Sequence, residues 1–330
     1  MNWKNKRVLV TGAGGFIGSH LTEELARQGA RVRALVRYNS RGDRGFLEDL
    51  SRDLASRVEI VAGDITDPHF VQTLVEGREV VFHLAALIAI PYSYAAPASY
   101  VSTNVTGTLN VLEACRRHKV KKLVHTSTSE VYGTALYTPI DEKHPLQGQS
   151  PYSASKIGAD QLAESYYRSF GLPVAICRPF NTFGPRQSSR AVIPTIISQL
   201  LQDPPRLPLG STTPLRDFNF VADTVSGFLA VAASPKSVGQ TINIGSGRTV
   251  SIGDTARLIM KLTGRKAKIE TARERIRPER SEVLKLQCDN RKARKLLGWK
   301  PRYTLEQGLV RTIDYVKNHL SDYRADIYNV

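Results

Sequence analysis

Apolar and polar positions alternate in blocks through the first half of the chain. Short, nearly continuous apolar runs are typical of strands buried on both faces, and helix-length segments lie between them. The runs are Arg7–Thr11, Val32–Val36, Val58–Val61, Val80–Leu84 and Leu123–Ser127, with Val174–Cys177 further along. Helices are expected at Ser19–Gln28, Thr103–Arg117 and near Ser153–Phe170. This order predicts an α/β protein with a doubly wound parallel sheet covered by helices on both faces.

The pattern changes after Pro179. Prolines and glycines cluster between residues 185 and 214, and short elements replace the regular alternation. We therefore expect residues 1–180 to form the main domain and residues 181–330 to form mainly a smaller lobe that closes over it. Part of this second half, about residues 218–245, is expected to return to the main domain.

Composition limits the class of protein. The 330 residues are 41% hydrophobic and 23% charged, as in ordinary soluble proteins. No run approaches the ~18 apolar residues of a membrane helix, and the N-terminal segment has no apolar signal core. Cys115, Cys177 and Cys288 share no short spacing, which argues against a CxxC zinc site and a disulfide framework. We expect a cytoplasmic protein with reduced cysteines, no metal site and no membrane segment.

The formal net charge of +16 is unevenly distributed, since Arg257–Arg302 holds 16 Lys and Arg against 5 Asp and Glu. Such a basic block can bind nucleic acid. Neither interleaved aromatic residues nor a nucleic-acid motif accompanies it. The block is therefore interpreted as a solvated face with a few arginines that meet an anionic small molecule, and no nucleic-acid partner is expected.

A glycine-rich turn, Thr11-Gly-Ala-Gly-Gly-Phe-Ile-Gly18, follows the first strand and opens the first helix. Glycines here allow a tight turn, close approach of a pyrophosphate and close packing of helix on strand, while the helix N-terminus offers free N–H groups to the phosphates. The sequence therefore predicts a Rossmann-type dinucleotide-binding domain. Its expected cofactor contacts in this turn are Gly12, Gly15, Phe16, Ile17 and Gly18.

The end of the second strand bears on the choice between NAD and NADP. An acidic residue there binds the adenosine ribose of NAD, whereas an arginine can meet the 2′-phosphate of NADP. The strand ends with Arg37 and no carboxylate, which slightly favours NADP over NAD. After the third strand, Asp64 is expected to accept from the adenine amino group and Ile65 to cover the adenine face.

Tyr152-Ser-Ala-Ser-Lys156 is the strongest chemical signal. Residues four apart lie on one face of a helix, so the Lys156 ammonium can sit near the Tyr152 phenol. A nearby cation favours the phenolate and lowers a pKa that is ordinarily about 10. Tyr152 is therefore predicted to take the proton from a sugar hydroxyl as hydride leaves the same carbon.

Upstream, Thr128, Ser129 and Glu130 follow the predicted strand Leu123–Ser127 at its carboxyl end, where open parallel sheets bind ligands. Thr128 and Glu130 are two apart, so a continued strand would place both on one side. The Thr128 hydroxyl would then reach the reacting oxygen of the substrate. The Glu130 carboxylate would reach the group one carbon further along. The alternative for Glu130 is a surface carboxylate at a strand end.

Together these residues resemble the extended short-chain dehydrogenase/reductase family over nearly the whole chain. Other matching motifs are His83-Leu-Ala-Ala86, Asn104, Arg178-Pro-Phe-Asn181, Gly184-Pro-Arg186, Arg216-Asp-Phe218, Asn243-Ile-Gly245 and Leu297-Gly-Trp299. The stretch Thr128–Gly133 is similar to nucleotide-sugar 4,6-dehydratases such as GDP-mannose dehydratase, and also to UDP-glucuronate decarboxylases. The stretches 86–94 and 186–194 look like bacterial dehydratases of legionaminic-acid-type pathways, which act on nucleotide-linked N-acetylglucosamine.

The resemblance implies the roles of further residues. Leu84, Ala85, Ala86 and Pro179 would contact the cofactor, which stays bound and is recycled. The substrate would meet five residues of the second half: Asn181, Arg190, Val192, Arg216 and Arg277. Pairing of helices corresponding to Thr103–Arg117 and Ser153–Phe170 implies a homodimer.

The reaction implied is a 4,6-dehydration, with UDP-N-acetylglucosamine as the expected substrate. Tyr152, Lys156 and Thr128 would serve oxidation at C4, and Glu130 would remove the C5 proton. The chain departs from dTDP-glucose dehydratases at Ser129, where they carry Asp. The donor to the departing C6 hydroxyl is thus Ser129, a bound water or protonated Glu130. The alternatives are a UDP-glucuronate decarboxylase, a 4-epimerase and a non-enzymatic NADP-binding protein with a nucleic-acid partner.

Overall fold

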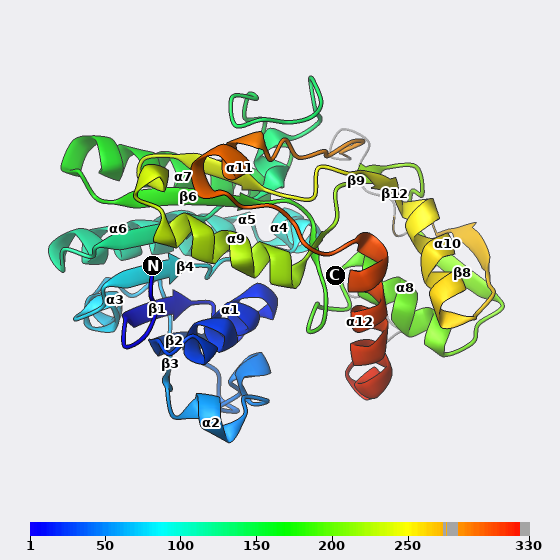
Figure 1. Ribbon diagram of the computed structural model, residues 1–330. Coiled ribbons are helices and arrows are strands. Elements are labelled where there is room, and N and C mark those ends of the chain that lie inside the picture. The colour runs from blue at the N-terminus through cyan, green and yellow to red at the C-terminus, as the bar shows by residue number, and fades with distance from the viewer. Residues whose placement is uncertain (273–274, 276–282, 324–330) are drawn as a thin grey trace.

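A seven-stranded parallel sheet forms the centre of the computed structural model (Figure 1), which describes residues 1–272, 275 and 283–323. Its strand order is β11-β6-β5-β4-β1-β2-β3. The strands are β1 Arg7–Thr11, β2 Arg31–Arg37, β3 Val58–Gly63, β4 Val80–His83, β5 Lys122–Thr126, β6 Val174–Pro179 and β11 Thr241–Ile244. The doubly wound parallel sheet predicted from the apolar runs is confirmed.

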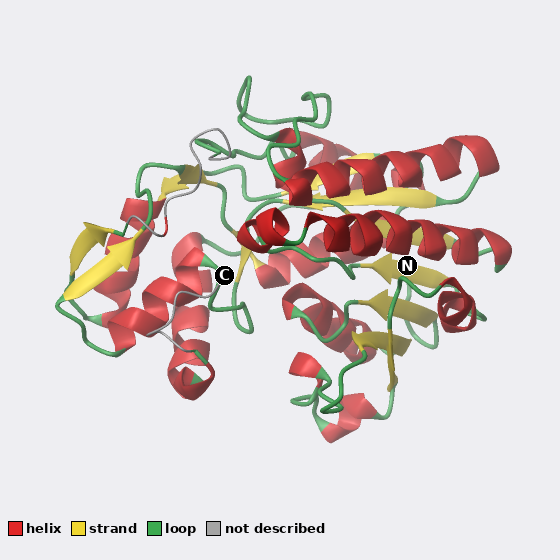
Figure 2. Ribbon diagram, turned by 180° about the vertical axis from the view of Figure 1, so that it is seen from behind, coloured by secondary structure: helices red, strands yellow, loops and turns green. Residues whose placement is uncertain are grey.

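Alternate residues of each strand enter two separate hydrophobic cores. In β1, Val8 and Val10 join one core, whereas Leu9 joins the other. The first core lies under α1 (Phe16–Arg27) and α9 (Val221–Ala233), and the second under α3 (Pro68–Val75), α6 (Gly107–Arg117) and α7 (Pro151–Phe170). This two-sided burial explains why the strands read as continuous apolar runs. Figures 1 and 2 show the two helical layers from opposite sides.

The remaining helices of the main sheet region are short or lie at its rim. They are α2 Arg52–Ala55, α4 Ile90–Ala95, α5 Pro97–Tyr100 and α11 Arg291–Leu297. Helix α7 starts at Pro151 because Ser150 and Ser153 form a reciprocal capping box. It ends where Gly171 takes the left-handed conformation, with φ +66°.

Two expected elements differ from the structure. The helix predicted over Thr103–Arg117 is in fact a π-helix, Val101–Thr106, that continues into α6. Strand β5 ends at Thr126, and Thr128 caps a 3-10 helix at Ser129–Tyr132. The expected continuation of the strand through Glu130 is therefore wrong, although Thr128 and Glu130 both still act on the Tyr152 phenol. The Thr128 hydroxyl accepts from the Glu130 N–H at 3.2 Å, and this bond favours a turn over an extended chain.

The chain after residue 181 builds a group of smaller elements beside the sheet, at the right of Figure 1. Helices α8 Val192–Leu201, α10 Ile252–Thr263 and α12 Leu305–Asn318 pack on one another. The short strands form three two-stranded pairs: β7 Thr182–Phe183 with β10 Asn219–Phe220, β8 Arg206–Leu209 with β13 Lys268–Thr271, and β9 Leu215–Arg216 with β12 Val250–Ser251. Within this half, α9 and β11 cover and extend the main sheet.

Among the residues described, no helix is both long and apolar enough to cross a membrane.

Candidate active site

The glycine-rich turn brings backbone groups together at the carboxyl end of β1. Gly12 has φ +69°, and a Cβ there would lie 2.8 Å from the Ala85 nitrogen. A Cβ on Gly18 would collide with the Gly12 carbonyl. Gly15 caps α1, whose first turn has neither a side-chain cap nor an acidic residue. The free N–H groups of Phe16 and Ile17 therefore remain available to an anion such as a pyrophosphate.

The loop after β2 folds back over this turn. The Arg37 side chain is exposed at the strand end. The Asn39 side chain closes the loop by accepting from the N–H groups of Arg41 (3.0 Å) and Asp43 (3.1 Å). The carboxylate of Asp43 accepts from the Gly45 N–H at 2.6 Å. Arg37 ends β2, and this strand contains no acidic residue. The contact of Arg37 with a 2′-phosphate stays a prediction.

Asp64 and Ile65 have structural roles of their own. Asp64 Oδ1 accepts from both the N–H and the hydroxyl of Thr66, each at 2.9 Å. Ile65 is only 4% exposed and belongs to the second core, where its side chain fills the space that a Cβ on Gly107 would need. Adenine binding by these two residues stays a prediction.

A hydrogen-bonded frame holds the loop after β4, which carries Leu84, Ala85 and Ala86. The Thr11 hydroxyl accepts from the N–H groups of Leu84 and Ala85, both at 3.1 Å. The Asn104 amide accepts from the Leu87 N–H (2.8 Å) and donates to the Leu87 carbonyl (2.9 Å). It also donates to the Ser155 hydroxyl at 2.9 Å. Asn104, matched in the sequence only as part of a motif, therefore clamps this loop to the helix that carries Tyr152.

Tyr152 is 7% exposed and lies where α7 meets the turn after β5. Burial raises the pKa of its phenol, the hydrogen bond with Thr128 lowers it, and the charge of Glu130 raises it again. The structure thus brings Thr128, Glu130 and Tyr152 together. Tyr100 packs edge-on against Tyr152, with ring centroids 6.3 Å apart. A phenol in this setting needs a nearby cation in order to act as a base near neutral pH.

Lys156 lies one helical turn further along α7, but burial raises the pKa of the Tyr152 phenol, which is the opposite of the lowering expected from the sequence. The Lys156 side chain is 4% exposed, and burial lowers its pKa to about 8, with Asp160 acting in the opposite direction. A lysine in this range changes its charge within the pH range of ordinary enzyme assays. The pKa values of both Tyr152 and Lys156 therefore depart from their ordinary values, and their acid/base roles stay predictions.

Ser129 lies in the 3-10 helix and is 2% exposed, whereas Thr128 and Glu130 are partly exposed. Ser129 therefore faces the protein interior more than its neighbours do. The sequence pattern predicts that Thr128 and Glu130 share one side, which Ser129 between them would not face. The tight turn separates Ser129 from its neighbours, because successive residues of a 3-10 helix point about 120° apart.

The structure describes four of the five substrate residues expected from the resemblance. Asn181 follows β6, and its buried amide oxygen makes no hydrogen bond among the described residues. Arg190 is exposed, and its charge opposes the rise that burial causes in the pKa of Tyr100, whose ring packs edge-on against that of Tyr152. Val192 begins α8, and Arg216 is 8% exposed in β9. Arg277 lies outside the described residues.

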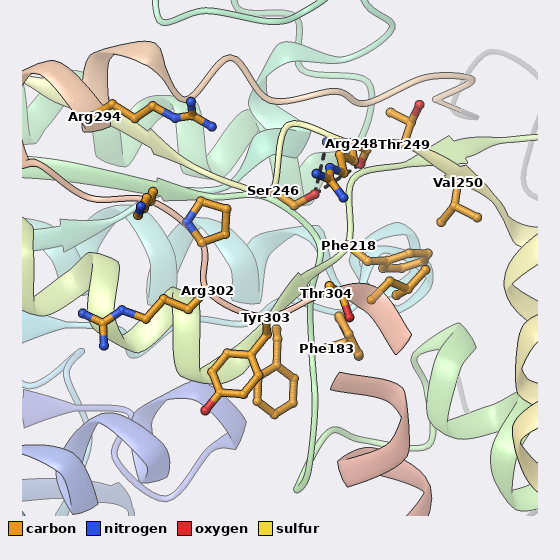
Figure 3. A pocket seen from close by; sticks show the side chains of 14 residues that line it. Phe183, Phe218, Ser246, Arg248, Thr249, Val250, Arg294, Arg302, Tyr303 and Thr304 are labelled. Atoms are coloured by element: carbon orange, nitrogen blue, oxygen red, sulfur yellow. Dashed lines mark hydrogen bonds between the residues drawn. The ribbon is translucent and has the colours of Figure 1, made fainter. Parts of the chain in front are cut away.

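A separate hollow of about 500 Å³ lies between β10 and the start of α12 (Figure 3). It contains none of the residues expected to act in catalysis. Its lining combines aromatic and basic side chains, which include Phe183, Phe218, Phe220, Arg248, Arg294, Lys300, Arg302 and Tyr303. Part of the basic sequence block thus surrounds this hollow and not the Tyr152 site.

Comparison with known proteins gives one family. The family described as GDP-mannose 4,6 dehydratase matches residues 9–312. A dTDP-glucose 4,6-dehydratase from Streptomyces antibioticus is 35% identical, over 94% of this chain and 92% of its own length. A UDP-glucose 4-epimerase from Mycolicibacterium smegmatis is 34% identical, over 94% and 99%. UDP-glucuronic acid decarboxylase 1 from Xenopus tropicalis is 32% identical, over 96% and 73%.

Solved structures agree with this result. A dTDP-glucose 4,6-dehydratase from Streptomyces venezuelae with NAD bound superimposes with a TM-score of 0.85 at 29% identity, covering 96% of this chain and 99% of its own. A UDP-glucuronic acid 4-epimerase from Bacillus cereus, in complex with UDP-glucuronic acid and NAD, also gives 0.85 at 31% identity, covering 95% and 99%. The similar proteins therefore share a fold and nucleotide-sugar chemistry but differ in reaction.

Proposed function

Because the chain belongs to the GDP-mannose 4,6-dehydratase family of NAD-dependent nucleotide-sugar enzymes, we propose that it is a nucleotide-sugar 4,6-dehydratase. The observation that supports this reaction over epimerisation is Glu130. Its charge acts on the Tyr152 phenol, so a second base lies beside the base that serves C4. Exchange of configuration at C4 requires no second base, whereas dehydration requires one for the C5 proton.

The residues around the glycine turn suit a dinucleotide, since Gly12, Gly15 and the start of α1 offer close backbone approach and free N–H groups. When bound there, the nicotinamide would accept hydride from C4 of the sugar and later return it to C6. Tyr152 would take the C4 hydroxyl proton, and Thr128 would share a hydrogen bond with that oxygen. Lys156 would stabilise the phenolate by its charge.

The second half of the reaction needs proton transfer at C5 and C6. The C4 ketone acidifies C5–H, and Glu130 would remove that proton. Water then leaves C6 with the help of Ser129, a bound water or protonated Glu130. Because Ser129 is almost completely buried, we assign this step to Glu130 in its protonated form. One carboxyl group would thus take the C5 proton and give it to the departing hydroxyl, and C5 would then take a new proton from solvent as hydride returns to C6.

For the substrate we propose UDP-N-acetylglucosamine, on the likeness of residues 86–94 and 186–194 to dehydratases of legionaminic-acid-type pathways. Asn181, Arg190, Val192, Arg216 and Arg277 would bind the nucleotide sugar. Arginines suit the diphosphate because their planar groups donate two parallel hydrogen bonds. The second candidate is a 4-epimerase, which is favoured by Ser129 in the place where dTDP-glucose dehydratases carry Asp.

One experiment decides between these reactions. The purified protein is incubated with UDP-, GDP- and dTDP-linked hexoses, including UDP-N-acetylglucosamine and UDP-glucuronate, and the product masses are measured. Dehydration removes one water, decarboxylation removes one carbon dioxide, and epimerisation leaves the mass unchanged. In D₂O, dehydration should also place a solvent deuteron at C5. An unchanged mass with inverted C4 would replace the dehydratase by the epimerase.

We also propose that the enzyme is a homodimer paired through helices α6 and α7. Large apolar side chains on and near these helices are exposed, among them Val101 (55%) and Phe170 (56%). Burial of such side chains in a partner is favourable. Sedimentation equilibrium should give twice the mass of the chain, and Phe170→Asp should shift the protein toward monomer.

A further inference from the structure

The turn before the expected substrate segment has an uncommon backbone conformation. Arg186, which matched the family only as the end of the motif Gly184-Pro-Arg186, has φ +68°. A residue with a Cβ is strained in this left-handed region, so surrounding contacts must hold it there. Arg190 and Val192, which are expected to bind the sugar nucleotide, follow within the next six positions. The contacts that hold Arg186 therefore also fix where this segment begins.

The contacts of Arg186 come from α1, the helix that begins at the glycine-rich turn. The Arg186 guanidinium forms an ion pair with Glu23, with 3.0 Å between Nη1 and Oε2. The same Nη1 donates to the Ser19 hydroxyl at 3.5 Å. Ser19 and Glu23 are one turn apart and lie on one face of the helix. The two side chains of the ion pair are only 13% and 23% exposed, so water and salt screen this attraction less than that of an open surface pair.

A second contact joins the same turn to the same face of α1. His20 Nε2 lies 3.0 Å from the Pro185 carbonyl oxygen, and a carbonyl can only accept, so the imidazole donates. Burial lowers the pKa of His20 to about 4. His20 is therefore neutral near pH 7 and adds no positive charge beside Arg186. Both the backbone before Arg186 and the Arg186 side chain are thus attached to α1.

Beyond this turn the segment is attached to the second half of the chain. The Gln187 carbonyl accepts from the Tyr323 hydroxyl at 3.1 Å. The Ser189 carbonyl accepts from the Thr195 hydroxyl of α8 at 2.7 Å. Arg190 follows directly, and its side chain is exposed. The segment therefore bridges two parts of the molecule, with α1 holding its start and C-terminal elements holding the rest.

The turn at Arg186 thus connects the residues expected to bind the sugar to the helix expected to bind the dinucleotide. We propose that Arg186 is a positioning residue whose ion pair with Glu23 sets the place of the bound sugar nucleotide relative to the cofactor. This rests on the proposed binding roles of Arg190 and the glycine-rich turn. Arg186 touches neither ligand and acts only through the segment that follows it. Hydride transfer is sensitive to such placement, since a shift of ~1 Å can cost ~10²-fold in rate.

Variants of the ion pair test the proposal by steady-state kinetics with the sugar nucleotide that the product-mass experiment identifies. Arg186→Ala should lower kcat by ~10-fold or more, because the sugar is no longer held in line with the nicotinamide. Its KM should stay within a few fold, since Arg190 is still present. Glu23→Ala should give the same loss, and Arg186→Lys, which keeps the charge, should recover most of it. The kcat is expressed per mole of bound cofactor, so that a smaller folded fraction does not count as a loss.

Two further variants separate the ion pair from other effects. Arg186→Gly allows the left-handed conformation without strain but removes the guanidinium, so its kcat should fall as far as that of Arg186→Ala. Wild-type kcat in Arg186→Gly would overturn the proposal, because the backbone turn alone would then suffice. Arg27→Ala is the matched control, since Arg27 is 55% exposed and is another partner of Glu23, at 2.8 Å. Its loss should leave kcat unchanged.

A double variant and a measurement without substrate complete the test. Glu23→Ala combined with Arg186→Ala should lose no more kcat than Arg186→Ala alone, since both remove one interaction, and losses that multiply would overturn the proposal. Hydrogen exchange of the purified enzyme should be faster in residues 187–191 of Glu23→Ala and Arg186→Gly than in wild type, and unchanged exchange would also overturn it. If Arg186→Ala does not fold, Glu23→Ala carries the same comparison. If wild type turns over no sugar nucleotide, the proposed reaction fails, and the exchange result alone then decides the role of Arg186.

Discussion

The two sides of Tyr152 are built in different ways. Toward the sheet, Lys156 and Asp160 are 4% and 2% exposed, and strand residues hold Asp160 through short hydrogen bonds. Toward the substrate, Arg190 is exposed and comes from an irregular segment between β7 and α8. Tyr152 and Lys156, the expected acid/base groups, thus lie on a helix that packs against the sheet, whereas the residues expected to select a substrate include Arg190 on a surface segment. This division agrees with a family in which similar chains are dehydratases, epimerases and decarboxylases.

The largest effect is expected on the sheet side. Tyr152→Phe removes only the acid/base hydroxyl, so turnover should fall by ~10⁴-fold, the upper end of the range for positioned general bases. Cofactor binding, measured by calorimetry, should be retained. Tyr167→Phe is a matched control on the same helix, since Tyr167 is exposed, and it should leave turnover unchanged. Turnover of the Tyr152 variant within a few fold of wild type would contradict the assignment.

Glu130→Gln tests the role of the carboxylate that acts on the Tyr152 phenol. The amide cannot accept the C5 proton, so formation of the 6-deoxy product should fall by ~10²-fold or more. Oxidation at C4 should persist, and the absorbance of the reduced nicotinamide should then appear without product release. Solvent deuterium at C5 is the parallel measurement on the wild type. Normal dehydration by the variant would show that Glu130 is a bystander.

Arg37→Ala tests the cofactor end. If Arg37 contacts a 2′-phosphate, its loss should weaken the binding of NADP⁺ by the ~1.5–3 kcal/mol of a hydrogen bond to a charged group. The binding of NAD⁺ should be nearly unaffected. Arg31→Ala, an exposed arginine at the other end of β2, is the control. The affinity for each dinucleotide is measured by calorimetry, and an equal loss of affinity for the two would exclude this role for Arg37.

Arg190→Ala should have the smallest effect and the most distinctive one. Loss of an exposed contact to the substrate should raise KM for the nucleotide sugar by about tenfold, while kcat stays within a few fold. Arg248→Ala, at the separate hollow beside α12, should change neither. A fall in kcat with unchanged KM would show that Arg190 acts in catalysis. The proposed division between acid/base residues and substrate-binding residues would then be wrong.

Local sequence patterns predicted the parts of the molecule that depend on neighbours along the chain. The apolar runs indicated six of the strands of the sheet, and the glycine turn and the Tyr152–Lys156 spacing indicated the site. The contacts between distant residues could not be read in this way. Asn243 lies 111 positions from Tyr132, to which it bonds, and Asn104 lies 51 from Ser155. The 3-10 helix at Ser129 was also missed, because the Thr128 side chain replaces strand hydrogen bonds by a local one.

The position of β11 has a consequence for how the chain is made. Strand β6 lies between β5 and β11, and β11 ends at Ile244, more than sixty residues after β6 ends at Pro179. While the ribosome synthesises the intervening segment, the outer edge of β6 has no neighbour, and the face that α9 later covers is exposed. An open strand edge beside an apolar face is prone to pair with other chains. A nascent or truncated chain that stops near residue 180 should therefore depend on chaperones, however complete its cofactor motif is.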